Sequence, residues 1–195
     1  MIITGKYPSL RLRRTRQHDW SRKLVQENNL SSSDLILPIF LTEGKNKKIP
    51  VQSMPGVYRY SINNLGIIVD KAIKKKIPMV ALFPYTNPKI KDLSGSESLN
   101  KNNLVCRAIK YIKKRYKNSI GVMCDVALDP YTSHGHDGLL KKNTILNDET
   151  LDILIKQAVL QAKMGCDVIA PSDMMDGRIK VIRKELDKEN LKDVQ

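Results

Sequence analysis

The chain has 195 residues, of which 41% are hydrophobic and 28% charged, a composition and length typical of one water-soluble domain or a large part of one. The sequence has no apolar run long enough to cross a membrane and no visible secretory signal, so we expect no membrane contact and a cytoplasmic location. The net charge of +14 would suit a nucleic-acid partner. However, the lysines are scattered over helix-like stretches without a nucleic-acid motif, so we expect solvated helix faces and no nucleic acid. Nucleic-acid binding through the N-terminal arginines stays an alternative, which predicts a steep salt dependence of affinity.

The cysteines are sparse and odd in number: Cys106, Cys124 and Cys166. Their spacing fits neither a disulfide framework nor a CxxC metal motif. Cys124 and Cys166 lie in apolar runs, where a free thiol behaves as a small hydrophobic side chain. We therefore expect buried structural thiols.

Residues 1–34 differ in composition from the rest of the chain. Four arginines between Arg11 and Arg16 precede Trp20, and no strand pattern occurs before Leu35. A basic stretch with few apolar residues cannot bury itself. We therefore predict an extended N-terminal arm that docks on a neighbouring subunit of a homo-oligomer.

From residue 35 onward, apolar strand patterns alternate with helical ones. The expected strands cover residues 35–40, 79–83, 121–128 and 166–170, and the expected helices begin near residues 61, 104, 148 and 177. Asn147 and Asp148 predict the N-cap of the third helix, and its expected buried face consists of Leu151, Leu154, Ile155, Ala158 and Val159. Alternating βα units imply a parallel sheet, either doubly wound or a barrel. Four units would make half of an eight-stranded TIM barrel.

Polar residues gather where the third expected strand ends, in the segment Asp125–Gly138 (DVALDPYTSHGHDG). It contains Asp125, Asp129, Asp137, His134 and His136. Oxygen and imidazole ligands at this density could hold a divalent cation, magnesium rather than zinc. The alternative is a polar loop whose side chains cap turns. Asp125 lies within an apolar strand, where a carboxylate is costly unless something pairs with it.

The fourth expected strand leads into Ala170–Arg178 (APSDMMDGR). Ser172, Asp173 and Asp176 could cap the following helix, and the two methionines could serve as packing or as a pocket wall. The carboxyl ends of parallel strands meet at one edge of a sheet, which favours a shared site with Asp125.

These two segments resemble the 5-aminolevulinate dehydratase (porphobilinogen synthase) family. The likeness continues in the same order through further segments: Arg13–Arg14, Trp20–Arg22, Leu37–Gly44, Met54–Val57, Ala81–Pro84 and Asn147–Thr150. The resemblance implies an arm over residues 1–34 and, over residues 35–195, the first four βα units of a TIM (β/α)8 barrel assembled as a homo-octamer or related oligomer. It implies a lyase that condenses two 5-aminolevulinate molecules to porphobilinogen in tetrapyrrole and haem biosynthesis.

The resemblance also implies roles for individual residues. Asp125 would be the catalytic carboxylate near the substrate amine, Ser172 a catalytic hydroxyl that contacts substrate, and Asp129 and Asp137 substrate or metal contacts. His136 matches a position implicated in a second metal site. Zinc-dependent members place cysteines at the positions of Ala127, Asp129 and Asp137, so no thiolate zinc site is expected. The aspartate-rich branch implies Mg²⁺, acting allosterically, with its main site in the second half of the barrel.

The family's Schiff-base lysines lie beyond the position of Gln195. We therefore expect the chain to be a fragment or a truncated form that lacks dehydratase activity by itself. A hypothesis of another class is a non-catalytic half-barrel that acts as an assembly module, either on a full-length subunit or with a second copy.

Overall fold

The computed structural model describes residues 5–195, and their contacts divide into two units, one up to Ser31 and one from Ser32 to Gln195. The first unit contains a 3-10 turn, Leu12–Arg16, and a short helix, α1 (Asp19–Leu24). Its buried residue is Ser21, whose Oγ lies 2.9 Å from the carbonyl oxygens of Thr15 and of His18. Leu12, Trp20 and Leu24 remain largely exposed. The sequence did not predict α1, because a helix this short gives no periodic signal.

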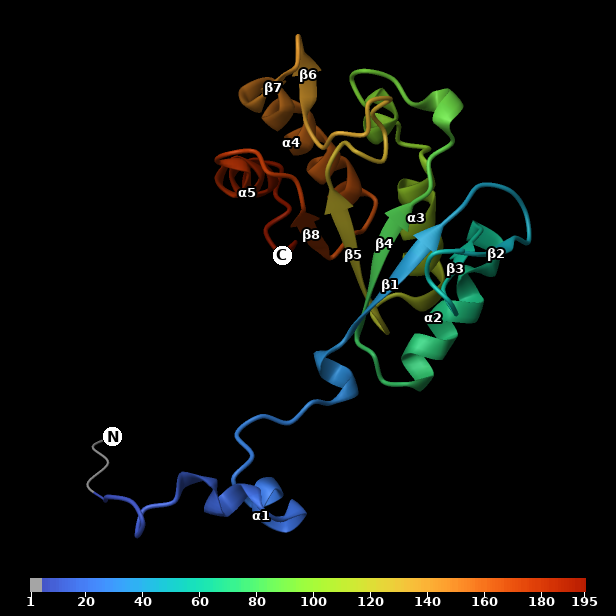
Figure 1. Ribbon diagram of the computed structural model, residues 1–195. Helices are drawn as coiled ribbons and strands as arrows, with labels where there is room; N and C mark the ends of the chain where they lie inside the picture. The colour runs from blue at the N-terminus through green and yellow to red at the C-terminus, as the bar shows by residue number, and fades with distance from the viewer. Residues whose placement is uncertain (1–4) are drawn as a thin grey trace. The chain divides into compact units, whose positions relative to one another are not determined.

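The second unit is an α/β fold with a mainly parallel sheet (Figure 1). Its parallel strands lie side by side in the order β1 (Ile36–Leu41), β4 (Met79–Pro84), β5 (Gly121–Val126) and β8 (Val168–Pro171). Beside β1 lie two short strands, β3 (Tyr58–Tyr60), parallel to β1, and β2 (Lys48–Pro50), antiparallel to β3. A separate hairpin consists of β6 (Leu139–Lys141) and β7 (Thr144–Leu146). The expected α/β class is confirmed.

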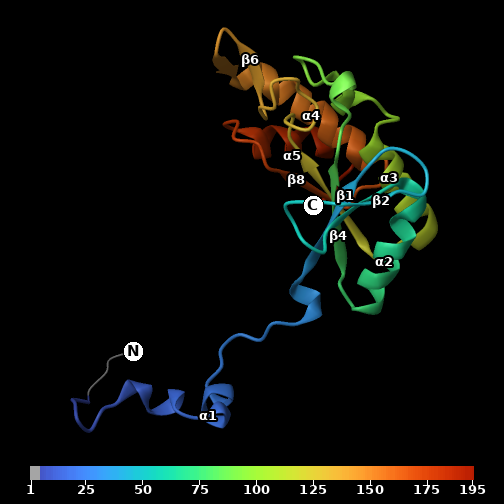
Figure 2. The ribbon, with the colours of Figure 1, turned by 45° about the vertical axis from the view of Figure 1, so that its right-hand side comes forward.

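The core lies between this sheet and the helices, which are α2 (Leu65–Lys74), α3 (Leu104–Tyr116), α4 (Asn147–Lys163) and α5 (Arg178–Lys188). In the turned view of Figure 2, α2 and α3 lie to the right of the strands. Side chains alternate between the faces of a strand, so every second strand residue points toward the helices. These residues are fully or almost fully buried: Ile39, Leu41, Val80, Leu82, Val122 and Cys124.

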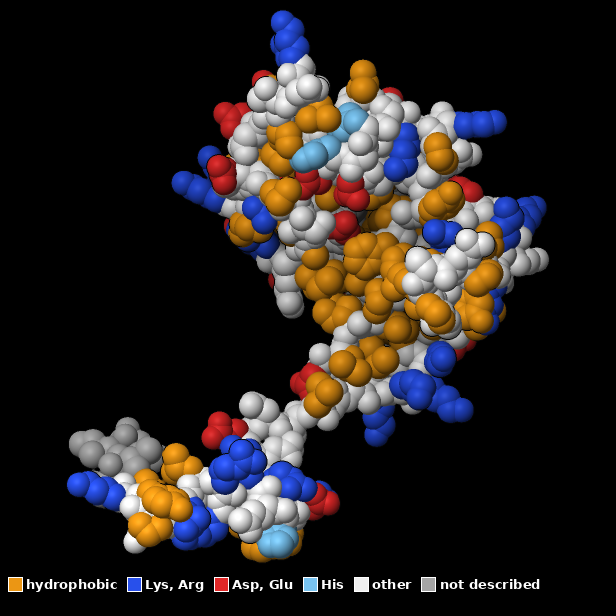
Figure 3. Space-filling model, in the orientation of Figure 1, with side chains coloured by type: hydrophobic (Ala, Val, Ile, Leu, Met, Phe, Trp, Pro, Cys, Tyr) orange, Lys and Arg blue, Asp and Glu red, His pale blue; other side chains and the backbone are white. Residues whose placement is uncertain are grey.

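The other face of the sheet is apolar as well, and no helix within residues 32–195 covers it. Its side chains are partly exposed: Ile36, Pro38, Phe40, Met79, Phe83 and Met123. The strand register sets Phe40 against Phe83, with ring centroids 5.9 Å apart. Figure 3 shows the resulting hydrophobic area. Strands with two apolar faces are typical of parallel sheets that are buried on both sides.

The amino ends of the strands are tied together by Asp167, just before β8. Its carboxylate pairs with Lys113 of α3 at 2.8 Å and accepts the N–H of Val122 in β5 at 2.8 Å. Gln195 lies along the outer edge of β8, donating to the Asp167 carbonyl (3.0 Å) and accepting from the Ile169 N–H (2.8 Å). This is the bonding pattern of a single parallel bridge between Val168 and Gln195.

Several expectations of detail were wrong. The helix expected from residue 61 begins as a 3-10 turn, with α2 proper at Leu65, and the last strand begins at Val168 rather than at residue 166. The short strands β2, β3, β6 and β7 were not predicted, because three residues in a turn-rich segment show no alternation.

The predicted N-cap of α4 was also wrong. The cap is Leu146, and Asn147 is the first helical residue. The Asn147 side chain instead accepts the N–H of Asp176 at 2.7 Å and donates to the Asp176 carbonyl at 3.3 Å. Asn147 thus braces the turn that precedes α5, a contact between distant segments that local cap preferences do not report.

The buried face of α4 is more polar than predicted. Leu154 and Ala158 are buried as expected, but Leu151, Ile155 and Val159 are only half-buried. Gln157 and Gln161 are buried in their place. Their side-chain amides donate to the backbone carbonyls of Ala127 (3.3 Å) and Asp125 (2.9 Å), which is why two polar residues can face the sheet.

The three cysteines are buried free thiols, as predicted. Burial raises the pKa of Cys106 to about 11 and that of Cys124 well above its usual value. In the described range, residues 5–195, no helix is long and apolar enough to span a membrane.

Candidate active site

The candidate site lies at the carboxyl ends of β5 and β8. Val122, Cys124 and Val126 point toward the helices, so Asp125 points to the open face of the sheet, beside Met123. In the neighbouring strand, Ala170 is paired with Asp125, and Ser172 follows just after the strand ends. The Ser172 hydroxyl donates to the Asp125 carboxylate, with 2.5 Å between Oγ and Oδ1. The fold thus brings together two residues to which the family resemblance assigns catalytic roles, and those roles stay predictions.

The surroundings of Asp125 raise the pKa of its carboxyl group. Burial is the largest cause, and the nearby carboxylates of Asp129 and Asp173 add to it. The Ser172 hydroxyl and the Val126 N–H act in the opposite direction, because they stabilise the carboxylate. A half-buried carboxyl group with a raised pKa holds a proton more strongly than an ordinary aspartate, which suits a group that accepts and donates protons.

Asp129 and Asp137 lie in the loop that follows β5. Burial raises the pKa of Asp129, and the carboxylate of Asp137 adds to this, while Lys91 and His136 oppose it. The Asp137 carboxylate accepts the N–H of Met174 at 3.1 Å, which connects this loop to the turn after β8. The site contains four aspartates, Asp125, Asp129, Asp137 and Asp173, and each lies within electrostatic range of two of the others.

His136 is held inside the same loop. Its Nδ1 accepts the N–H of Gly138 at 3.0 Å and lies 2.7 Å from Oδ1 of Asp137. The Nδ1 of His134 accepts the N–H of His136 at 3.1 Å. Figure 3 shows acidic and histidine side chains gathered beside the hydrophobic area of the open sheet face. The role of His136 as a metal ligand stays a prediction.

The residues of this site do not form a ready metal centre. Across residues 5–195, no group of three or more His, Cys, Asp or Glu side chains is placed to hold a metal ion. The positions of Ala127, Asp129 and Asp137 supply no thiolate for zinc. Asp125 and Asp137 accept hydrogen bonds from Ser172 and Met174 instead.

Three further residues support the site although no role was predicted for them: Gln157, Gln161 and Arg178. Both glutamines bind backbone carbonyls at the end of β5. Arg178 forms an ion pair with Asp173, which had been considered only as a cap residue. The sequence did contain a signal for the two glutamines, because they occupy positions of the helical repeat at which an apolar residue is expected. The sequence offered no comparable signal for Arg178.

The fold and the site define a class: an α/β protein with a mainly parallel sheet whose polar residues meet at the carboxyl edge, as in many enzymes. The family model described as delta-aminolevulinic acid dehydratase matches residues 9–195. The chain therefore belongs to the delta-aminolevulinic acid dehydratase family, which is also called porphobilinogen synthase, and the resemblance noted in its motifs is confirmed.

Named relatives agree with this assignment. The chain is 54% identical over 187 residues to the delta-aminolevulinic acid dehydratase of Bradyrhizobium diazoefficiens, covering 96% of this chain and 53% of that protein. It is 43% identical over 184 residues to the protein of the same name from Ruminiclostridium josui, covering 94% of this chain and 88% of that protein.

A solved structure is similar too. The dehydratase of Toxoplasma gondii ME49, in complex with the reaction product porphobilinogen, superposes with a TM-score of 0.89 at 40% identity, covering 94% of this chain and 52% of that one. The chain thus spans about half the length of the Bradyrhizobium and Toxoplasma proteins.

Proposed function

We propose that this chain contributes the Asp125–Ser172 side of the active site of a porphobilinogen synthase, a lyase that condenses two 5-aminolevulinate molecules to porphobilinogen. The observation that carries the proposal is the hydrogen bond between Ser172 and a carboxyl group with a raised pKa at the carboxyl edge of the sheet. The names of the relatives and the porphobilinogen in the Toxoplasma structure support the same substrate class.

In this proposal Asp125 moves protons near the substrate amine, since a raised pKa makes its carboxylate a stronger base than that of an ordinary aspartate. The Ser172 hydroxyl contacts substrate and orients the carboxylate. Asp129 and Asp137 face the same region and are substrate contacts. Mg²⁺, as an allosteric ion held mainly outside these residues, stays a prediction, as does a cytoplasmic location, which the three buried free thiols support.

We further propose that residues 35–195 are half of a (β/α)8 barrel, completed by a second half-barrel. Three observations support this. The second face of the sheet is apolar and uncovered, and parallel strands with two apolar faces occur almost only where both faces are buried. Among the described residues, the Ile36–Ile39 part of β1 has a strand partner only on the β4 side. The Bradyrhizobium and Toxoplasma relatives are about twice as long as this chain.

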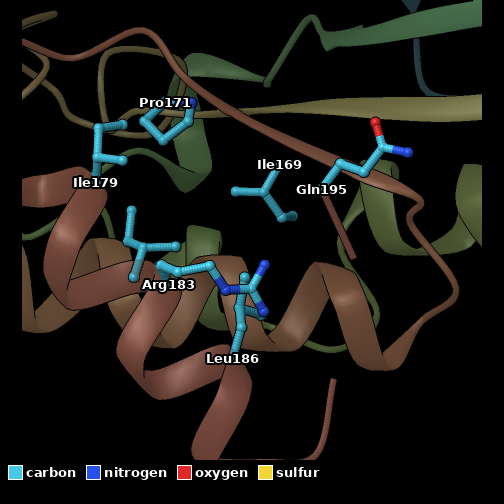
Figure 4. A pocket seen from close by; sticks show the side chains of 7 residues that line it. Ile169, Pro171, Ile179, Arg183, Leu186 and Gln195 are labelled. Atoms are coloured by element: carbon cyan, nitrogen blue, oxygen red, sulfur yellow. The ribbon is translucent and has the colours of Figure 1, made fainter. Parts of the chain in front are cut away.

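The outer side of β8 and α5 supports the same proposal. A pocket of about 90 Å³ lies there, lined by Ile169 and Pro171 of β8 and by Ile179, Ile182 and Leu186 of α5. Figure 4 shows these apolar side chains, with Gln195 at the edge of β8. An apolar pocket beside a strand edge that already pairs with Gln195 suits the next βα unit of a barrel.

The experiment that tests the function joins this chain to the C-terminal half of the Bradyrhizobium diazoefficiens relative in one chimeric polypeptide. Porphobilinogen formation is measured for the chimera and for the 195-residue chain, together with borohydride trapping of 5-aminolevulinate and mass spectrometry. We expect product and a lysine adduct in the chimera and neither in the chain alone. The matched control is the chimera with Asp125→Asn, which is expected to fold and form no product.

The outcomes separate the parts of the proposal. A folded chimera that forms neither adduct nor product would overturn the function. Product formation by the chain alone would overturn its expected inactivity and would show that a lysine within these 195 residues has become the nucleophile.

The second candidate function is a non-catalytic assembly module, which the exposed apolar sheet face favours. It predicts a defined dimer, or co-purification with a full-length subunit through the N-terminal arm. Light scattering of the pure chain tests it, and an aggregating monomer would contradict it.

A further inference from the structure

The turn between β8 and α5 contains an ion pair between the buried Asp173 and the partly exposed Arg178. The Asp173 side chain is 0% exposed, and its Oδ2 lies 3.3 Å from Nε of Arg178. Neither of these two atoms has a hydrogen-bond partner among the residues that the structure describes. Replacing a buried ion pair by packed apolar side chains is often neutral or stabilising. Its presence in this turn therefore points to a geometric role rather than to stability.

Both members of the pair also hold the backbone of Met175. Asp173 Oδ1 accepts the Met175 N–H at 2.7 Å, and Arg178 Nη1 donates to the Met175 carbonyl at 2.9 Å. The Met175 side chain is buried and packs on Gly138, where an added Cβ would lie 2.9 Å from the Met175 methyl carbon. Hydrogen bonds within the turn thus hold its backbone, and the Met175 side chain packs it against the loop that follows β5.

Ser172 directly precedes this turn. Its side chain is exposed, so packing does not hold it in place. The strand ends at Pro171, so the backbone of the turn sets the direction in which Ser172 points. In the structure that direction brings Oγ to 2.5 Å from the Asp125 carboxylate.

We propose that Asp173 and Arg178 are a positioning pair that fixes the turn and thereby holds the Ser172 hydroxyl against Asp125. The proposal rests on the proposed function, in which Ser172 and Asp125 act on substrate. It is tested on the 195-residue chain without any activity, because the contact between Ser172 and Asp125 is measured directly.

The measurement is the pKa of Asp125, followed by NMR of the ¹³C-labelled carboxyl group and assigned with Asp125→Asn. In the wild-type background, Ser172→Ala is expected to raise this pKa, because it removes a hydrogen-bond donor to the carboxylate. The variant Arg178→Lys keeps the positive charge but loses the guanidinium group that binds the Met175 carbonyl. In this background, Ser172→Ala is expected to raise the pKa of Asp125 by less than about half as much as it does in the wild type.

Comparing the Ser172→Ala step in two backgrounds cancels the direct effect of any altered charge on Asp125. If Arg178→Lys fails to fold, the double variant Asp173→Asn/Arg178→Gln removes both charges of the pair together, and the Ser172→Ala step is measured in that background instead. Arg183→Lys is the matched control, since Arg183 also lies on α5 and donates to backbone carbonyls, of Val194 and Leu191, away from the turn. The proposal would be overturned if Ser172→Ala raised the pKa of Asp125 as much in both pair variants as in the wild type.

The chimera supplies an independent readout. If Ser172 loses its position, we expect Arg178→Lys to lower kcat/KM on the order of 10–100-fold, while Arg183→Lys leaves it unchanged. A folded chimera that forms no porphobilinogen would refute the proposed function. The pKa measurement on the chain alone would still decide whether the pair positions Ser172.

Discussion

At the scale of single residues, Asp125 and Asp92 show opposite effects of environment on a carboxyl group. Burial and neighbouring carboxylates raise the pKa of Asp125. Asp92 lies in the loop after β4, where its carboxylate accepts the N–H groups of Ser94 (2.9 Å) and Ser96 (3.0 Å) as well as both serine hydroxyls. These bonds lower the pKa of Asp92 from 3.8 to about 2. The two residues should therefore contribute to the free energy of unfolding with opposite dependences on pH.

For Asp125, the folded state resists ionisation. Its stabilising contribution is present below the usual aspartate pKa and is lost as the pH rises through the raised folded value. We therefore expect Asp125→Asn to increase the free energy of unfolding at pH 7 by about 1 kcal/mol, and to change it little at pH 3. Urea unfolding at both pH values measures this. A variant that is less stable at pH 7 would show that the carboxylate is well paired in the folded chain.

For Asp92, the folded state favours the carboxylate. Its contribution is present above pH 3.8 and is lost as the pH falls toward about 2. Asp92→Asn is expected to reduce the free energy of unfolding at pH 7 by about 1 kcal/mol, because hydrogen bonds to a charged acceptor are replaced by weaker ones. The difference from the wild type should vanish near pH 2. Asp152→Asn, at an exposed position on α4, is the control and should behave like the wild type.

At the scale of elements, Asp167 joins α3, β5 and the segment leading into β8. Its carboxylate satisfies the Val122 N–H at the amino end of β5 and pairs with the partly buried ammonium group of Lys113. These contacts set how α3 and β8 approach β5. Packing alone does not fix this arrangement, because apolar contacts are not directional.

We expect Asp167→Ala to reduce the free energy of unfolding by about 2 kcal/mol, since it leaves a backbone N–H and an ammonium group without their acceptor. Glu189→Ala, which removes a more exposed pair between Lys163 and Glu189, should have a much smaller effect, because solvent screens an exposed ion pair. Chemical denaturation of both variants tests the difference. Equal losses would mean that Asp167 acts only as a surface charge.

At the scale of the whole molecule, the open apolar sheet face provides a test of the proposal that this chain is half of a barrel. Phe83 and Phe40 pack on each other but are only half-buried in this chain. If a second half-barrel covers them, their burial should stabilise the completed molecule far more than it stabilises the 195-residue chain.

We therefore expect Phe83→Ser to lower the free energy of unfolding by less than about 1 kcal/mol in the chain and by about 3–5 kcal/mol in the chimera. The chain should also bind the dye 1-anilinonaphthalene-8-sulfonate, and the chimera should bind much less. Ile67→Ser on the exposed side of α2 is the control and should have a small effect in both proteins. Equal effects of Phe83→Ser in the two proteins would contradict burial of this face by a second half.

The sequence by itself determined the α/β class, the positions of the main strands and helices, and the family. The spacing of apolar residues along a strand or helix depends on which of its side chains are buried. This spacing can therefore be recognised without knowing how the elements pack. The segments Asp125–Gly138 and Ala170–Arg178 identified the family through the identity and order of their residues, and the family model then matched residues 9–195.

Only the tertiary structure decided which polar residues meet. Ser172 and Asp125 are 47 positions apart, and strand register together with the turn after β8 brings them into contact. The same holds for Asn147, for which local preference predicted a helix cap but whose side chain binds Asp176. It holds also for Gln157 and Gln161 of α4, which face the sheet because they donate to the backbone carbonyls of Ala127 and Asp125. A buried polar group is stable only if the fold supplies its partner, and that partner lies in a distant segment that no local pattern can reveal.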